Sequence, residues 1–384
     1  MRRVLAATGG RNEYGLLRSA VRALNARADL RCELLLTGNH LDPRFGSTVS
    51  EIEADGSAVA GVAEITMSED SNRSMARCLG EGITAITDLL WEQKPDLVLL
   101  LGDRFEALAA ALAAYYLRIP VGHVHGGDVT QGGVLDDSVR HAITKLSHIH
   151  FAATRASAER IIKLGEEPWR VHVVGAPGLD GIAQGGYAGR SEVARQLDWD
   201  GIEPLIVGTQ HPNSGSPEAA GEEAVEVLEA VVSLGCRAVF TYPNQDPGHQ
   251  AIITRLEEYA ARCPRLGVRR SLGHRVYIGA LACAAAVVGN SSSGLIETTL
   301  FGVPTVNVGD RQRGRERAEN VIDAPCDRHA IAEALHTCLS DTAFRTQARG
   351  CSKPYGDGRA GERIADIIAG LAFEPELLRK QITY

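Results

Sequence analysis

The chain has 384 residues, with 40 Lys and Arg against 48 Asp and Glu, so its formal net charge is −8. An acidic chain with only 5% aromatic residues is a poor candidate for general nucleic-acid binding, which relies on basic patches and stacking platforms. Its length is typical of two domains, each large enough to bury its own core. The 41 glycines exceed the usual share of roughly 7%, so we expect many turns and close backbone approaches.

The lengths of the apolar runs and the spacing of the cysteines indicate the cellular compartment. The apolar run before Gly9 is shorter than the ~7–15 residues of a secretory signal. The longest weakly polar stretch, 277–288, is too short for a ~20-residue membrane span. The eight cysteines form no Cys-x-x-Cys pair. We therefore expect a cytoplasmic protein with reduced cysteines and no membrane association.

In the first half, continuous apolar runs alternate with segments of helical spacing. Such runs indicate parallel strands that are covered on both faces. We expect strands at 4–8, 32–37, 96–101, 120–123, 149–153 and 171–174, and helices at 14–26, 71–91, 105–117 and 136–147.

A glycine-rich stretch without a strong strand follows, and then a second alternation begins. We expect strands at 205–208, 238–241, near 268, at 286–289 and at 304–308, and helices at 217–234, 248–262, 273–284, 293–300, 327–339 and 359–371. The fold class is thus α/β, with two Rossmann-like doubly wound domains facing across a cleft. We expect a first domain at 1–180, a linker at 181–203, a second domain at 204–360, and a final helix and tail at 361–384 that can cross back to the first domain.

Ligands of such sheets bind beyond the carboxyl ends of the strands, so residues that follow strands are the first candidates. Gly9-Gly10-Arg11 follows the first strand and opens a helix, a place where backbone N–H groups and a guanidinium can hold a phosphate. The alternative is an ordinary glycine-rich turn. Asp103 follows the strand at 96–101 and suits acid–base chemistry, or it caps the next helix.

The segment 123–141 packs four Gly, three Asp and three His into one connection. Such density suits a functional loop. His123 and His125 would share one face of a strand, but the spacing of zinc-site ligands is missing, so we expect no metal. Asp136 and Asp137 precede a helix, so one can cap it while the other is catalytic.

In the second half, polar side chains again follow strands. His211 in TQHPN can donate to a phosphate, or it is a structural histidine. Asn244 and Asp246 lie in the turn TYPNQD. The loop VGNSSSGLIE provides Ser291 and Ser292 at a helix start and Glu297 within reach of ribose hydroxyls, or it is only a serine-capped helix.

Four arginines between Arg311 and Arg317 suit a diphosphate better than a solvated face in so acidic a chain. With the two anion cradles, they predict a nucleotide-diphosphate ligand.

Together these residues resemble the hydrolysing UDP-N-acetylglucosamine 2-epimerases of sialic acid and nonulosonate pathways. The resembling stretches run in order from residue 1 to about 322: GGRNEYGLL, LLLTGNHLDPRFGSTVSEIEADG, LLLGDRFEALAAA, HVHGGDVTQGGVLDDSVRHAITKLSHIHF, TQHPN, TYPNQD and VGNSSSGLIETTLFGVPTVNVGDRQRGRERAENVI. The stretches at 123–151 and 288–322 are the specific ones.

The resemblance implies a fold of the glycosyltransferase-B type and a reaction on a UDP-2-acetamido sugar. UDP is eliminated across C1–C2 through a glucal intermediate, and water then adds with inversion at C2, which yields UDP and a free N-acetylmannosamine-type sugar. No redox cofactor is needed. The resemblance also implies a homodimer or homotetramer.

Residue by residue, the resemblance implies catalytic acid–base roles for Asp103 and Asp136 and a place for His211 near the diphosphate. It also implies UDP or substrate contacts for Ser291, Ser292, Glu297, Arg11, Arg311, Asn244 and Asp246. Some members carry Glu at the place of His125 and others Glu at the place of Gln131, so Asp128 could stand in as the third carboxylate, and His125 and Asp128 join the catalytic candidates.

Several functions remain open from the sequence. The first loop departs from many relatives, so a UDP-2,4-diacetamido-6-deoxy sugar is an alternative substrate. A non-hydrolysing 2-epimerase and a glycosyltransferase of the same architecture are alternative activities, although the helix that begins at DDSVRH looks more like the hydrolysing branch. A nucleotide-sugar sensor without catalysis is an alternative of another class.

Overall fold

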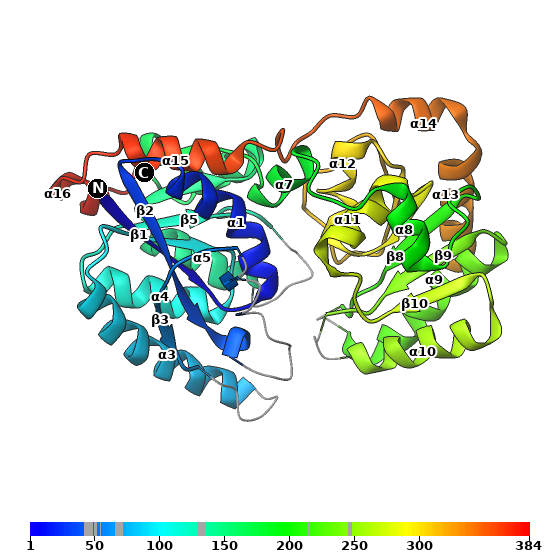
Figure 1. Ribbon diagram of the computed structural model, residues 1–384, viewed down its shortest axis with the longest axis horizontal. Coiled ribbons are helices and arrows are strands. Elements are labelled where there is room, and N and C mark those ends of the chain that lie inside the picture. The colour runs from blue at the N-terminus through cyan, green and yellow to red at the C-terminus, as the bar shows by residue number, and fades with distance from the viewer. Residues whose placement is uncertain are drawn as a thin grey trace. The chain divides into compact units, whose positions relative to one another are not determined.

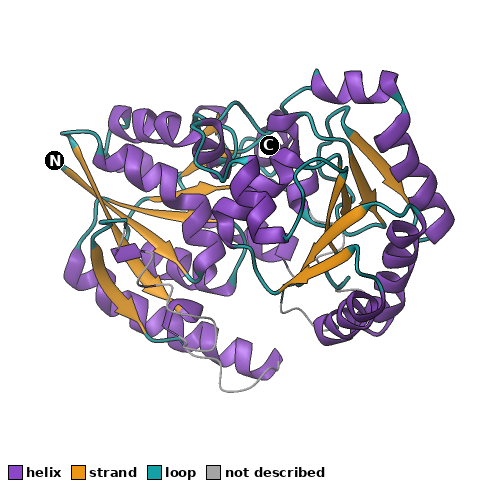
Figure 2. Cartoon of the chain, turned by 45° about the vertical axis from the view of Figure 1, so that its right-hand side comes forward, coloured by secondary structure: helices purple, strands orange, loops and turns teal. Residues whose placement is uncertain are grey.

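The computed structural model describes residues 1–41, 49, 52–53, 55–65, 72–129, 136–213, 216–244 and 248–384, without the side chains of Arg11, Asn12, Asn39, Leu41, Asn72 and Pro217. The chain divides into two compact units (Figure 1). Unit 1 holds the described residues of 1–128, 135–180 and 355–384, and unit 2 holds those of 129–134 and 181–354. In each unit helices pack against a sheet (Figure 2), which confirms the α/β class.

The sheet of unit 1 has seven strands in the order β3-β2-β1-β4-β5-β6-β7, and every described pairing is parallel. The strands are β1 Arg2–Thr8, β2 Leu30–Thr37, β3 Val59–Ala63, β4 Leu97–Leu101, β5 Val121–Val124, β6 Ile149–Ala152 and β7 Val171–Val173. The strand order reverses between β1 and β4. The loops that follow these two strands, which carry Gly9 and Asp103, therefore flank the crevice where doubly wound sheets bind ligands.

The helices of unit 1 are α1 Arg11–Asn25, α3 Asn72–Gln93, α4 Phe105–Tyr116, α5 Asp136–Leu146, α6 Arg155–Lys163, α15 Ala360–Gly370 and α16 Pro375–Leu378, with short 3₁₀ turns at Gly38–Leu41, Pro168–Arg170 and Pro177–Leu179. Strand β1 is buried on both faces. Val4 and Ala6 pack in the core with α1 and α15, whereas Leu5 and Ala7 pack in the core with α3 and α4. Alternate residues of one apolar strand thus fill two cores.

The C-terminal tail is held in unit 1 by buried charges. Arg170 is 1% exposed, and its guanidinium donates to the carbonyl oxygens of Glu376, Leu377 and Arg379. Lys380 lies 2.7 Å from the buried carboxylate of Glu166, which also binds Lys145 and His150. These contacts satisfy the buried guanidinium and carboxylate. No described helix is long and apolar enough to cross a membrane.

Unit 2 has a six-stranded sheet in the order β10-β9-β8-β11-β12-β13, and its described pairings are also parallel. The strands are β8 Leu205–Thr209, β9 Arg237–Thr241, β10 Leu266–Arg269, β11 Ala286–Gly289, β12 Thr305–Val308 and β13 Val321–Ala324. The helices are α7 Asp180–Ala183, α8 Arg190–Leu197, α9 Ala220–Ser233, α10 His249–Arg262, α11 Gly273–Cys283, α12 Thr298–Phe301, α13 Arg328–Ser340 and α14 Thr342–Arg349, with 3₁₀ turns at Pro217–Ala219 and Ser292–Gly294.

Three sequence expectations need correction. Strands β3 and β13 were not predicted, because both are short edge strands with exposed or half-buried residues. The segment 181–203, expected as a linker, contains helix α8. The helix expected at 293–300 is instead a 3₁₀ turn followed by α12. At this point Gly294 approaches β12 so closely that a Cβ would lie 2.9 Å from the Thr305 methyl group.

Gly289, the last residue of β11, and Gly309, which follows β12, both have positive φ but differ in their surroundings. Comparing them distinguishes the cost of backbone strain from that of steric overlap. Gly289 has φ +126°, and a Cβ there would overlap the Thr209 carbonyl oxygen; Gly309 has φ +70° and open space. We expect Gly309→Ala to lower the free energy of unfolding by about 1 kcal/mol and Gly289→Ala by more than about 3 kcal/mol. Urea unfolding followed by circular dichroism measures both, and equal midpoints for the two variants would contradict the close approach.

Candidate active site

A buried ion pair lies behind the loop that follows β1. Glu106, 3% exposed, accepts two hydrogen bonds from the Arg104 guanidinium, at 3.1 and 2.8 Å. The carboxylate fits there because two neighbours lack side chains. A Cβ on Gly9 would lie 2.9 Å from the Glu106 carboxyl carbon, and one on Gly38 would lie 2.6 Å from its oxygen. Part of the glycine excess therefore makes room for a buried charge.

Glu13 accepts a hydrogen bond from a backbone N–H group that was expected, from the sequence, to bind a phosphate. Its carboxylate accepts the Gly9 backbone N–H at 2.5 Å and lies 3.8 Å from the Arg104 guanidinium. Burial raises the pKa of Glu13 to about 7; Arg104 lowers it and Glu106 adds to the rise. The Gly9 amide is thus taken by this chain's own carboxyl group, and the Arg11 side chain lies outside the described residues.

Asp103 follows β4 and pairs with the guanidinium of Arg140, which is 2% exposed on α5. The N-cap position of α4 is Arg104, so the alternative that Asp103 caps this helix is wrong. Arg140 also donates to Asp137 at 2.6 Å and to the Asp128 carbonyl oxygen at 2.8 Å. One buried guanidinium therefore joins the ends of β4 and β5 to the start of α5.

Asp136 and Asp137 form the first turn of α5, where carboxylates favour the positive end of the helix dipole. Asp137 is held by Arg140, and Asp136 is exposed to solvent. Of the two, Asp136 is therefore the more accessible to solvent.

The two histidines of the loop do not share a strand face, because β5 ends at Val124. His123 is fully buried; its Nε2 donates to the Gly102 carbonyl oxygen at 2.8 Å and its Nδ1 lies 3.2 Å from the Thr144 hydroxyl. Burial lowers the pKa of His123 to about 3. The ring is therefore neutral, and it fixes the backbone immediately before Asp103.

His125 lies in the turn after β5 with a left-handed backbone, φ +62°. A residue with a Cβ adopts this conformation only where its surroundings impose it. Its Nδ1 is 3.0 Å from one oxygen of Asp128, and the other oxygen accepts the Ser157 hydroxyl at 2.7 Å. Ser157, at the start of α6, has no counterpart among the residues predicted from the sequence.

In unit 2, His211 follows β8 and is held by amides from two neighbouring strands. Its backbone N–H donates to the Asn290 side chain at 2.7 Å, and the Asn290 amide returns a bond to its carbonyl at 2.9 Å. The Asn244 N–H, a fixed donor, lies 3.0 Å from Nδ1. The Asn244 side-chain oxygen lies 3.1 Å from the same nitrogen. Burial, reinforced by Arg311, lowers the pKa of His211 to about 3. His211 is thus neutral, and its Nδ1 is held by Asn244.

The loop after β11 gathers the other predicted binding residues. The Asn290 carbonyl accepts Arg311 at 3.2 Å and Gln312 at 2.8 Å. Ser291 caps the turn that contains Ser292, and Glu297 directly precedes α12. Arg317 pairs with Asp323 at 2.7 Å, so the arginine cluster serves the fold in part. Asp246 lies outside the described residues.

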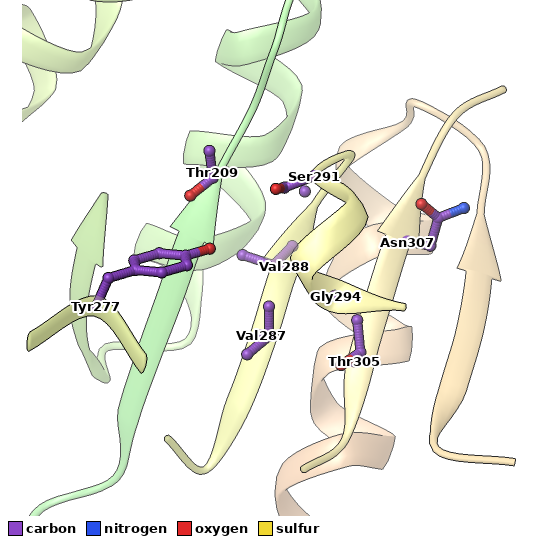
Figure 3. A pocket seen from close by; sticks show the side chains of 9 residues that line it. Thr209, Tyr277, Val287, Val288, Ser291, Gly294, Thr305 and Asn307 are labelled. Carbon is purple, nitrogen blue, oxygen red and sulfur yellow. The ribbon is translucent and has the colours of Figure 1, made fainter. Parts of the chain in front are cut away.

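Figure 3 shows a small pocket beside this loop, with room of about 10 Å³, roughly what one water molecule needs. It is lined by Thr209, Tyr277, Val287, Val288, Gly289, Ser291, Gly294, Thr305 and Asn307. The Tyr277 phenol from α11 points toward Thr209 and Val288 (Figure 3). Burial raises its pKa, against hydrogen bonds with the hydroxyls of Ser293 and Thr209. Sequence reasoning missed Tyr277 because it occupies an ordinary helix.

The structure therefore gathers the predicted residues in two groups. In unit 1, Asp103, Asp128, Asp136 and His125 lie after β4 and β5 and at the start of α5. In unit 2, His211, Asn244, Ser291, Ser292, Glu297 and Arg311 follow β8, β9, β11 and β12. Within the described ranges, no group of three His, Cys, Asp or Glu residues is arranged to hold a metal ion.

The sequence profile of the UDP-N-acetylglucosamine 2-epimerases matches residues 22–369. The chain belongs to this family. It is 35% identical over 384 residues, covering all of both chains, to a Legionella pneumophila protein named UDP-N,N'-diacetylbacillosamine 2-epimerase (hydrolyzing). It is 31% identical over 370 residues, 96% of this chain and 95% of the other, to UDP-N-acetylglucosamine 2-epimerase of Neisseria meningitidis.

The fold of this family member matches solved structures of the same kind. The crystal structure of the UDP-GlcNAc 2-epimerase from Neisseria meningitidis bound to UDP-GlcNAc superposes with a TM-score of 0.82 at 19% identity, covering 95% of this chain and 99% of that one. The similarity confirms the architecture predicted from the sequence.

Buried neutral histidines predict a stability that depends on pH. Burial lowers the pKa of His40 and His148 to about 4 and that of His123 and His211 to about 3. Below about pH 6.5 the unfolded chain binds more protons than the folded chain, so stability is lost as the pH falls. We expect a loss of the order of 1–2 kcal/mol per histidine between pH 7 and 5.

Urea midpoints at pH 7, 6 and 5 measure this loss. His148→Asn keeps an acceptor for the Val121 N–H, which His148 Nδ1 now accepts at 3.1 Å, and removes the titrating ring. The variant should therefore show a smaller loss than the wild type. Midpoints that do not move between pH 7 and 5 would contradict the burial of these rings.

Proposed function

We propose that the protein is a hydrolysing 2-epimerase of UDP-2-acetamido sugars such as UDP-N-acetylglucosamine. UDP is eliminated across C1–C2 through a glucal intermediate, and water adds with inversion at C2 to give UDP and a free sugar of the N-acetylmannosamine type. The observation that carries the proposal is the match, along the full length of both chains, to a relative named as a hydrolysing 2-epimerase.

The proposal assigns the nucleotide to unit 2. Neutral donors and a guanidinium suit a diphosphate, because they donate hydrogen bonds to its oxygens and stabilise its negative charge. His211 is neutral and is proposed to donate from Nε2, and Arg311 lies next to the Asn290 loop. Ser291 and Ser292 are proposed to bind phosphate oxygens, Glu297 the ribose hydroxyls, and Asn244 to orient His211. Arg11 and Asp246 remain proposed substrate contacts.

The proposal assigns proton transfer at the sugar to unit 1. Asp103 is held by a buried guanidinium, and Asp136 is exposed on the first turn of α5. Elimination and water addition need groups that take and return protons at C2 and at the attacking water. In this assignment, Asp103 after β4 and Asp136 on α5 serve the attacking water and the return of a proton to C2.

A second candidate substrate is a UDP-2,4-diacetamido-6-deoxy sugar. The full-length relative at 35% identity is named for such a sugar, whereas the meningococcal relative, at 31%, is named for UDP-N-acetylglucosamine. The true substrate should give at least a tenfold higher kcat/KM than the other sugar in a direct comparison, and a preference for the diacetamido sugar would favour this second candidate.

Turnover in deuterated water, followed by proton NMR, tests the proposed reaction. Each UDP-sugar is supplied separately, and the expected products are UDP and a free sugar deuterated at C2. An intact UDP-sugar with exchange at C2 would indicate the non-hydrolysing reaction instead. Transfer of the sugar to an added acceptor would indicate a glycosyltransferase, and binding without turnover of any UDP-sugar would indicate a sensor.

Asp103→Asn and Asp136→Asn test the proposed acid–base groups. Each should lower kcat by at least ~10² and leave UDP binding within a few-fold. Asp137→Asn is the matched control, since it lies on the same turn and keeps an acceptor for Arg140; its kcat should fall less than about tenfold. Near-wild-type turnover in either test variant would remove that residue from the mechanism.

A further inference from the structure

Three side chains meet where the turn after β5 contacts the start of α6: His125, Asp128 and Ser157. Building on the proposed function, we propose that His125 Nε2 is the base that takes the sugar's C2 proton, and that Asp128 and Ser157 are positioning residues behind it. The sequence suggested Asp128 itself as a third catalytic carboxylate. The geometry assigns it a different role.

Asp128 is engaged on both oxygens. One oxygen lies 3.0 Å from His125 Nδ1, and the other accepts the Ser157 hydroxyl at 2.7 Å. The residue is 7% exposed, and its carbonyl oxygen accepts Arg140 at 2.8 Å. To meet a substrate directly, this carboxylate would have to abandon two hydrogen bonds in a buried place, which carries a desolvation penalty. Asp128 is therefore built to orient His125.

The same contact decides the tautomer of His125. A carboxylate accepts only, so Nδ1 carries a proton, and in the neutral ring Nε2 then presents a lone pair. Nε2 is buried, and within the described ranges of the chain it has no hydrogen-bonding partner. A buried polar atom without a partner is uncommon and points to a missing ligand or water. His125 Nε2 is thus a positioned proton acceptor.

The surrounding backbone holds this turn tightly. His125 has φ +62° and Gly127 has φ +75°, and a Cβ on Gly127 would overlap the Ser157 carbonyl oxygen. The Arg160 side chain of α6 donates to the Gly127 carbonyl. Helix α6 therefore supplies both Ser157 and the surface against which the turn is packed, so the orientation of His125 depends on α6 as well as on Asp128.

The proposed step is an elimination with His125 as the base. His125 Nε2 takes the C2 proton, the C2–H electron pair becomes the C1=C2 double bond, and the C1–O bond breaks with its electron pair leaving on UDP. The imidazolium that forms lies 3.0 Å from the Asp128 carboxylate, which stabilises its charge. Water addition and reprotonation of C2 on the opposite face belong to other groups.

Nitrogen-15 NMR of the free enzyme at neutral pH tests the dyad without reference to turnover. The His125 resonance is assigned by its loss in His125→Gln. We expect the neutral form of the ring to carry its proton on Nδ1, and in Asp128→Ala we expect a shift toward the Nε2–H tautomer. A wild-type His125 with its proton on Nε2 would overturn the proposal, whatever the activity of the enzyme.

Steady-state kinetics on the preferred UDP-sugar tests the roles. His125→Gln and Asp128→Asn should each lower kcat at least 100-fold with KM within a few-fold. Ser157→Ala should lower kcat about tenfold, and Ser157→Thr, which keeps the hydroxyl, should restore most of it. Ser138→Ala, an exposed hydroxyl on α5, is the control and should match the wild type.

Other results would contradict the dyad. Turnover within a few-fold of wild type in His125→Gln would remove His125 as the base. Equal losses in Ser157→Ala and Ser157→Thr would show a packing role for Ser157. If wild type converts no UDP-sugar at all, the proposed function fails and the catalytic roles fail with it, while the tautomer measurement still reports on the geometry.

Discussion

The arrangement of unit 1 depends on one buried guanidinium, that of Arg140. It binds the Asp103 and Asp137 carboxylates and the Asp128 carbonyl oxygen, and so ties the end of β4, the turn after β5 and the start of α5 together. A buried cation requires such partners, and the partners in turn need the cation. The positions of the proposed acid–base groups are therefore set by the same interaction that satisfies a buried charge.

In unit 2, neutral side chains hold the candidate binding residues in place. His211 and Asn290 exchange two hydrogen bonds, and Asn290 also accepts Arg311, so the ends of β8 and β11 and the loop after β12 are joined by amides and one guanidinium. Burial keeps His211 uncharged by lowering its pKa to about 3. In the proposed reaction, the carboxylates and His125 of unit 1 transfer protons, and the neutral donors and Arg311 of unit 2 stabilise the leaving diphosphate.

The sequence predicted the parts of the fold that depend on local pattern. Strand β4 is five apolar residues in a row, and its buried place follows directly. Strand β3, VAGVA, is also apolar, but it lies at the edge of the sheet with Val59 and Val62 exposed, and it was missed. The residues after strands were found because chain order alone places them at one edge of the sheet. The contacts between them could not be predicted. Ser157, which donates a hydrogen bond to Asp128, is 29 residues away in the sequence, and Glu13 accepts the Gly9 N–H from one turn into α1.

The central claim is that the reaction breaks the C1–O bond of a UDP-2-acetamido sugar and leaves the diphosphate intact. Turnover of the preferred UDP-sugar in water enriched in oxygen-18, with mass spectrometry of both products, tests this claim most directly. Elimination followed by water addition predicts that the label enters the free sugar and that the released UDP contains none. Label in the phosphate of UDP would show cleavage of a P–O bond and would contradict the account.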